Sequence, residues 1–152
     1  MANLLGREAI LTSKVPTREV EIPEWDGVAL IRSPSTLTRM KIVEGFNERD
    51  AAEEAYKADQ AKPVEEREGL PAVTVLDTSV VSVMFAIIDE NLQPIFGWDD
   101  YDKFLELSYP TIQYIYKQMI QLEARLPVPV EEQKKSSGTA RKGASSSASR
   151  SR

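Results

Sequence analysis

Apolar and polar residues alternate with two different periods along the chain, and each period predicts its own kind of element. Between residues 19 and 32, apolar residues alternate with polar or small ones on either side of Asp26-Gly27. This alternation is typical of half-buried strands, and Asp-Gly between two such runs is a strong hairpin signal. We therefore expect a β-hairpin over about residues 19–32. Because Pro23 has no N–H group to donate, its strand is expected at a sheet edge or with a bulge there.

Helical spacing of apolar residues predicts a mainly α-helical body after the hairpin. The expected helices cover about residues 35–46, 48–61, 77–88, 99–107 and 110–126. Ser35 is the expected N-cap of the first helix, in which apolar residues recur every three positions. The expected inward face of this helix consists of Leu37, Met40, Val43 and Phe46. In 77–88 the residue types favour a strand and the periodicity favours a helix, and we follow the periodicity.

The clearest helix follows Pro110, where apolar residues recur at spacings of three and four. This stripe consists of Ile112, Ile115, Met119, Leu122 and Leu126. Such a stripe is either the core-facing side of a helix or a surface for a partner, and the pattern leaves both interpretations open. Trp25 is a further candidate for partner contact. Its large apolar surface cannot be covered by a lone hairpin, so we expect a helix to pack against it.

Composition changes abruptly near the carboxyl end. Residues 131–152 hold seven serines and six basic residues, and their apolar residues are three alanines. Such a segment cannot bury enough surface to offset the entropy lost on ordering, so we expect it to be disordered. The predicted fold class is therefore α+β, with a small N-terminal β-hairpin, a mainly α-helical body over residues 1–130 and a disordered C-terminal tail.

The residue types exclude most familiar catalytic sites. The chain has no His and no Cys, which excludes Cys/His zinc sites, thiol nucleophiles and His-dependent catalysis. Two acidic runs remain as candidates, at Asp89-Glu90 and at 99–102. We interpret the first as a polar turn, and the second as a helix start with Asp99 or Asp100 as cap. We therefore expect no enzymatic activity, no cofactor and no metal.

Charge is distributed unevenly along the chain. The net charge of the whole chain is −5. Residues 131–152 carry +4, so residues 1–130 carry −9. Much of the acidity lies in 47–69, which we expect to form an exposed helix and a loop. The basic tail could bind phosphates, but no aromatic residue lies among its charges to stack on bases, so a solubilising tail is the preferred interpretation. We find neither a signal peptide nor an apolar run long enough to span a bilayer.

Two segments resemble a known family. The run from Val15 to Val28, VPTREVEIPEWDGV, resembles the PTxEVEVPEWGG hairpin that opens the tail assembly chaperones of long-tailed (siphovirus-type) phages and prophages. The run from Ala86 to Phe96, AIIDENLQPIF, is similar to the family's VVDEDGNPLF segment. Asp26 and Asn91 stand where the family often has Gly, and the acidic stretch 47–69 matches nothing in the family pattern. Leu4-Leu5 precedes the first run, and an acidic-capped helix and a final amphipathic helix follow the second, as in the family. Together the matches bracket residues 4–126.

The resemblance implies a non-catalytic chaperone of virion morphogenesis. Members of this family bind the tape measure protein in the host cytoplasm, keep it soluble, promote assembly of the tail tube around it, and are absent from the mature virion. A longer form made by frameshifting is expected to bind the tail tube protein, and self-association is a further possibility. The alternative is a small structural component of the virion, such as a tail-completion or head–tail protein.

Overall fold

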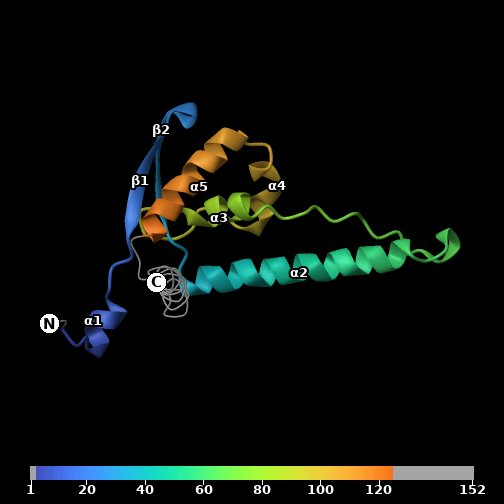
Figure 1. Ribbon diagram of the computed structural model, residues 1–152, viewed down its shortest axis with the longest axis horizontal. Helices are drawn as coiled ribbons and strands as arrows, with labels where there is room; N and C mark the ends of the chain where they lie inside the picture. The colour runs from blue at the N-terminus through green and yellow to red at the C-terminus, as the bar shows by residue number, and fades with distance from the viewer. Residues whose placement is uncertain (1–2, 125–152) are drawn as a thin grey trace, which may run out of the picture. The chain divides into compact units, whose positions relative to one another are not determined.

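The computed structural model, which describes residues 3–124, contains a small antiparallel sheet with helices against one of its faces (Figure 1). The elements are α1 (Arg7–Leu11), β1 (Thr17–Ile22), β2 (Gly27–Arg32), α2 (Thr36–Gln60), α3 (Thr78–Ala86), β3 (Ile87–Ile88), α4 (Tyr101–Phe104) and α5 (Tyr109–Glu123). Short 3₁₀ turns lie at Pro23–Trp25, Val64–Glu66 and Trp98–Asp100. The predicted α+β class is confirmed. The predicted tail over 131–152 lies outside the described residues, and so does Leu126.

The hairpin is confirmed, with a different turn from the one expected. β1 and β2 pair antiparallel, and the last pair joins Ile22 and Gly27. Between them a 3₁₀ turn begins at Pro23, whose carbonyl accepts the Asp26 N–H at 3.1 Å. Asp26 itself has φ of 51°, so Asp-Gly ends a longer loop and does not form the turn alone. Pro23 directly follows the edge strand β1, so the predicted edge position is confirmed.

The third strand was not predicted. α3 ends at Ala86, and the next two residues, Ile87 and Ile88, pair with Ile31 and Leu30 of β2. The helix expected to reach residue 88 is therefore two residues too long. The Ile87 N–H still donates to the Val83 carbonyl, but the backbone of Ile87 is extended and pairs with β2. The strand order β1–β2–β3 places β2 in the centre of the sheet.

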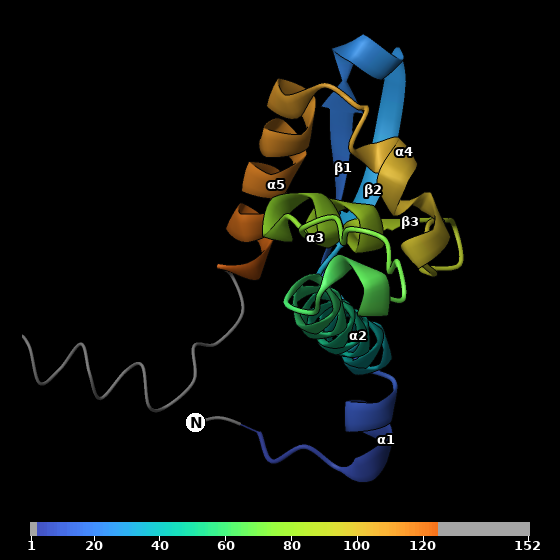
Figure 2. The ribbon, with the colours of Figure 1, turned by 90° about the vertical axis from the view of Figure 1, so that its right-hand side faces the viewer.

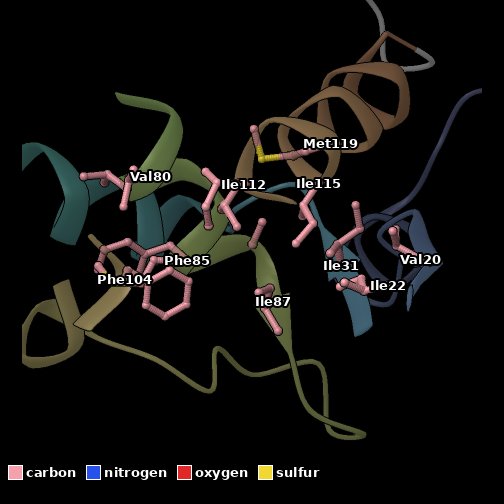
Figure 3. Close-up of a cluster of buried hydrophobic side chains, with 14 of the residues drawn as sticks. Val20, Ile22, Ile31, Val80, Phe85, Ile87, Phe104, Ile112, Ile115 and Met119 are labelled. Carbon is pink, nitrogen blue, oxygen red and sulfur yellow. The ribbon is translucent and has the colours of Figure 1, made fainter. Parts of the chain in front are cut away.

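The hydrophobic core lies between the inner face of the sheet and the helices α3 and α5, which lie on the same side of β1 and β2 in Figure 1. Strands β1 and β2 contribute the side chains of Val20, Ile22 and Ile31, each at most 2% exposed. Figure 3 shows α5 side chains directed toward the same cluster. The further buried members come mainly from α3 and α5: Val80, Val81, Val83, Met84, Phe85, Ala86, Ile87, Tyr101, Phe104, Ile112, Ile115, Met119 and Leu122.

The helices expected over 35–46 and 48–61 are a single helix, α2, so the predicted break is wrong. Ser35 caps it as expected, since its hydroxyl accepts the Thr38 N–H at 3.2 Å. Glycine has a low helix propensity, so Gly45 is unfavourable within α2. Its presence is explained by the close approach of the Trp98 side chain to the helix at this position. A Cβ atom at this position would lie 2.1 Å from the indole of Trp98, whose Nε1–H donates to the Lys41 carbonyl at 3.1 Å. Gly45 thus provides space for Trp98 and does not end the helix.

A buried carboxylate organises the far end of α2. Asp59 is 1% exposed and accepts N–H groups of Glu68, Gly69 and Leu70 at 2.7, 3.1 and 3.1 Å. Gly69 has φ of +75°, a conformation that side chains other than Gly rarely adopt. These hydrogen bonds, of which that from Glu68 is the strongest, lower the pKa of Asp59 below its ordinary value despite the cost of desolvation. The loop after α2 is therefore fixed to the helix by a charged anchor.

The helix expected over 99–107 is shorter in the structure. The 3₁₀ turn Trp98–Asp100 leads into α4, which ends at Phe104. The predicted N-cap role of Asp100 is wrong, because its side chain makes no cap bond to α4. It accepts the Gly97 N–H at 3.0 Å instead, as the third residue of the 3₁₀ turn. Tyr101 and Phe104 are buried in the core, whereas Leu105, which directly follows α4, is 42% exposed. α5 matches the helix expected over 110–126 as far as the described residues extend.

We predict that Gly45→Ala destabilises the fold by about 1–3 kcal/mol, because the new methyl group overpacks against the Trp98 indole. Helix propensity alone predicts the opposite, namely that Gly45→Ala raises the stability of the protein by about 1 kcal/mol. Chemical denaturation measures the difference. In a Trp98→Ala background the same substitution should stabilise the protein, and a gain in stability with Trp98 present would contradict the close approach.

For Asp59→Asn, we predict loss of hydrogen-exchange protection at the amides of residues 68–70, with Asp50→Asn, an exposed change on the same helix, as the control. Because the folded pKa of Asp59 is lowered, the anchor stabilises the loop above the unfolded pKa and is lost as the pH falls through the folded one. Protection factors measured by NMR at several pH values test this. Equal protection in both variants would show that the charge does not anchor the loop.

Candidate functional site

The stripe predicted on the last helix lies in the core. Ile112, Ile115, Met119 and Leu122 are between 0% and 4% exposed and pack with the sheet and α3. Figure 3 shows Ile112, Ile115 and Met119 in this cluster. Of the two interpretations that the sequence left open, the core-facing side accounts for these four residues. Contact of the stripe with a partner stays a prediction, and in this fold it would require α5 to separate from the sheet.

Trp25 lies in the loop of the hairpin and is 39% exposed. The sequence predicted a helix packed against it, but Trp25 is not a member of the hydrophobic core. The indole that the helices cover is that of Trp98, which contacts the rings of Phe46 and Phe85 edge to face. Of the five candidate residues that the structure describes, Trp25 is therefore the one with an accessible side chain.

An exposed apolar surface lies on α2, where the sequence predicted an inward face. Leu37, Met40 and Val43, here called the α2 strip, are 63%, 64% and 44% exposed. The side of α2 that packs inward instead presents Ile42 and Phe46 to the core. The prediction failed because the inward side also contains polar Thr38 and Gly45, which interrupt its apolar pattern. Thr38, Ile42, Gly45 and Phe46 stand at i, i+4, i+7 and i+8. This helical spacing could have identified the inward side if small and polar residues had been counted together with the apolar ones.

The α2 strip borders a hollow of about 950 Å³ on the protein surface. Pro34 and Ser35 line one end, and the α2 residues that line the rest include Arg39, Met40, Val43, Glu44, Asn47, Glu48 and Ala51. The lining combines apolar groups with charges of both signs. Such an apolar surface rimmed by polar residues is typical of a site for another protein chain.

A second hollow lies between the loop of the hairpin and the start of α5. Figure 2 shows that these two segments lie at the same end of the sheet. Its volume is about 470 Å³. We call this the hairpin cleft, and its lining residues are Glu21, Ile22, Pro23, Glu24, Pro110, Thr111 and Tyr114. The Thr111 hydroxyl donates a hydrogen bond to the Glu24 carboxylate across it. This bond ties the hairpin loop to the first turn of α5.

The acidic runs have structural roles in the described part of the chain. Asp89 accepts the N–H groups of Asn91 and Gln93 at 2.8 and 3.0 Å, so it organises a turn. The Ser79 hydroxyl, together with the Val80 N–H, lowers the pKa of Asp77, the N-cap of α3. Within residues 3–124, no group of three or more acidic side chains is arranged to bind a metal ion. These carboxylates therefore serve as caps and turn anchors.

In the described part of the chain, no helix combines the length and the apolar character that crossing a bilayer requires.

Comparisons with known proteins identify a family. Residues 7–136 match the family model described as phage tail assembly chaperone. A solved structure, that of the bacteriophage HK97 tail assembly chaperone, is similar over 76% of this chain and 94% of that chain, at 22% sequence identity and a TM-score of 0.42. The comparison with curated proteins found no match.

The burial of the α5 stripe gives a test of its structural role. We predict that Ile115→Asp destabilises the protein by about 4 kcal/mol or more, because it places an unpaired charge in the core. Ile120→Asp is the matched control, since Ile120 is on the same helix and 45% exposed, and it should cost about 1 kcal/mol or less. Thermal or urea unfolding measures both. Similar losses in the two variants would contradict the assignment of the stripe to the core.

Proposed function

Because this chain belongs to the phage tail assembly chaperone family, we propose that it binds the tape measure protein of its phage and keeps that protein soluble in the host cytoplasm. In this proposal it promotes assembly of the tail tube around the tape measure protein and is not part of the finished virion. It acts by binding alone, without a chemical step. The tail tube protein is a second proposed partner, through a longer frameshifted form.

The exposed apolar α2 strip is the observation that carries this proposal. Leu37, Met40 and Val43 are spaced along a helix whose opposite side packs against the core. An apolar row on a fixed helix is suited to pack against one apolar face of a helical client, in the manner of two helices in contact. By covering such a face, the chaperone would remove from water the surface through which the client aggregates.

The size of the strip favours reversible binding. Covering one exposed Leu, Met or Val side chain contributes about 1–2 kcal/mol, and association costs about 4 kcal/mol or more in lost freedom of motion. Three such side chains therefore give a weak contact by themselves. A weak contact suits a chaperone that has to leave its client when the tube subunits assemble.

The charge of the chain supports the same function. Residues 1–130 carry a net charge of −9, and the solvent-exposed parts of α2 and its following loop are rich in Glu and Asp. A net charge far from zero keeps protein complexes apart in solution. A complex of the client with this chain would thus gain solubility both from covered apolar surface and from added negative charge.

We predict that Leu37→Gln/Met40→Gln weakens the affinity for the tape measure protein about tenfold or more, because two apolar contacts are lost. Gln has nearly the helix propensity of Leu and Met, so α2 itself should be unaffected. The matched control is Leu105→Gln/Leu107→Gln, which changes two side chains that are 42% and 36% exposed and lie outside the strip. Co-expression with the tape measure protein, followed by pull-down and measurement of its soluble yield, gives the comparison.

Two results would contradict the proposal. One is a tape measure protein that is equally soluble with and without this chain and forms no complex with it. The other is recovery of the chain from purified virions in stoichiometric amounts, which the structural-component alternative predicts. If the two double variants weaken binding equally, the proposed function is retained, but the α2 strip is not the surface that binds the tape measure protein.

A further inference from the structure

The sheet has an outer face, opposite to the core, and this face is partly apolar. The register pairs Glu19 with Leu30 and Glu21 with Val28, so these four side chains lie on the face opposite to the core residue Val20. An antiparallel sheet covered on one face usually alternates apolar and polar residues, as the last four positions of β1 do. β2 is apolar at four successive positions. It therefore has the pattern of a strand that is covered on both faces.

Ile88 of β3 extends the apolar part of the outer face. It pairs with Leu30 and is 2% exposed, yet it does not belong to the core cluster. Together with Val28, Leu30 and residues 89–91 it lines a hollow of about 390 Å³. Val28 is 62% exposed, and Leu30 is half-buried. The outer face thus holds a small apolar cluster that is separate from the core and open to solvent.

The segment that precedes β1 is another uncovered apolar surface, here called the arm and defined as residues 3–14. All of its residues are exposed, and α1 within it buries no side chain. Its large apolar side chains, which are 55–100% exposed, are those of Leu4, Leu5, Ile10 and Leu11. Single exposed apolar residues are common, but a group of them on one short segment indicates a contact with another surface. The described part of the chain does not supply that surface.

The arm and the outer face carry opposite charges. Arg7 and Lys14 against Glu8 give the arm a net charge of +1. Because Arg7 already pairs with Glu8 at 3.0 Å, Lys14 is the cation that the arm offers to a partner. On the outer face, Glu19 and Glu21 take part in no ion pair in the part of the chain that the structure describes. Attraction between these groups favours contact of an arm with an outer face.

The cation on the outer face does not neutralise these carboxylates. Arg32 donates instead to the carbonyls of Ser33 and Leu92, each at 3.1 Å. Two outer faces packed on each other would bring Glu19 and Glu21 of one copy near the same carboxylates of the other, and like charges across a contact are unfavourable. The outer face consequently favours an apolar segment that carries a positive charge, and the arm is such a segment.

From this complementarity we infer that two copies of this chain form a dimer by exchanging arms. The arm of each copy packs its leucines on Val28 and Leu30 of the other, with Lys14 near Glu19 and Glu21. A two-fold arrangement forms this contact twice, which brings the buried area toward about 1,200 Å², the lower limit for a stable interface. The dimer goes beyond the proposed function and leaves the α2 strip free for the client.

Sedimentation equilibrium of the intact chain over about a hundredfold range of concentration tests the inference, since a dimer forms by mass action. We expect a monomer–dimer equilibrium. Leu5→Gln/Leu11→Gln changes two side chains that are each 64% exposed, so the fold is kept. It should raise the dissociation constant of the dimer about tenfold or more, because each arm loses two apolar contacts. Val28→Thr should raise the constant about threefold or more.

Val75→Thr is the matched control for Val28→Thr, because Val75 is 78% exposed and lies outside both surfaces. It should leave the dissociation constant unchanged. A chain that stays monomeric, or equal weakening by these two variants, overturns the inference. The outcome is separate from that of the proposed function, since Leu37→Gln/Met40→Gln should lose the tape measure protein and keep the dimer.

A spin label shows which copy supplies the arm. The chain has no cysteine, so Ala9→Cys gives a single labelling site on the exposed arm. Labelled chain is mixed with isotope-enriched chain that has no label, and the NMR amide signals of the enriched chain are recorded. We expect the signals of Val28 and Leu30 to broaden. A dimer without this broadening, or broadening only when the label and the isotope are on the same chain, overturns the exchange.

Discussion

The indole of Trp98 packs against α2 at Gly45, and the position of the longest helix depends on this contact. A side chain at residue 45 would overlap the ring, whose Nε1–H also donates to the Lys41 carbonyl. Phe46 and Phe85 contact the same ring from α2 and α3. The contact therefore joins α2 to the covered side of the sheet. It also fixes which face of α2 is turned away from the core.

The apolar stripe of α5 and the α2 strip consequently differ in their burial. The sheet has one inner face to cover, and α3 and the stripe of α5 cover it, so Ile115 and its neighbours are removed from solvent. α2 packs through Ile42 and Phe46, which leaves Leu37 and Met40 exposed. The stable core and the surface proposed for the client are thus built from separate helices. Client binding can then occur without disturbing the core.

Sequence reasoning predicted the elements that local patterns determine, and it failed where a distant contact decides. The hairpin and α5 follow from alternation, from Asp26-Gly27 and from helical spacing. β3 depends on the pairing of Ile87 with β2, which no local pattern shows. The predicted break in α2 arose because the composition turns polar and acidic at Asn47, although the helix continues through this point. The α2 strip was assigned inward because its spacing fits one helical face, and only the contact of α2 with Trp98 shows which face is covered.

The central claim is that the client covers α2 and leaves α5 in the core, and oxidative footprinting of methionines tests it most directly. Among the methionines of residues 3–124, Met40 is 64% exposed, while Met84 and Met119 are at most 4% exposed, so Met40 should oxidise before the other two in the free protein. In complex with the tape measure protein, we expect Met40 to be protected and the other two to stay unreactive. A complex in which Met40 oxidises as fast as before, or in which Met119 becomes reactive, would contradict this account.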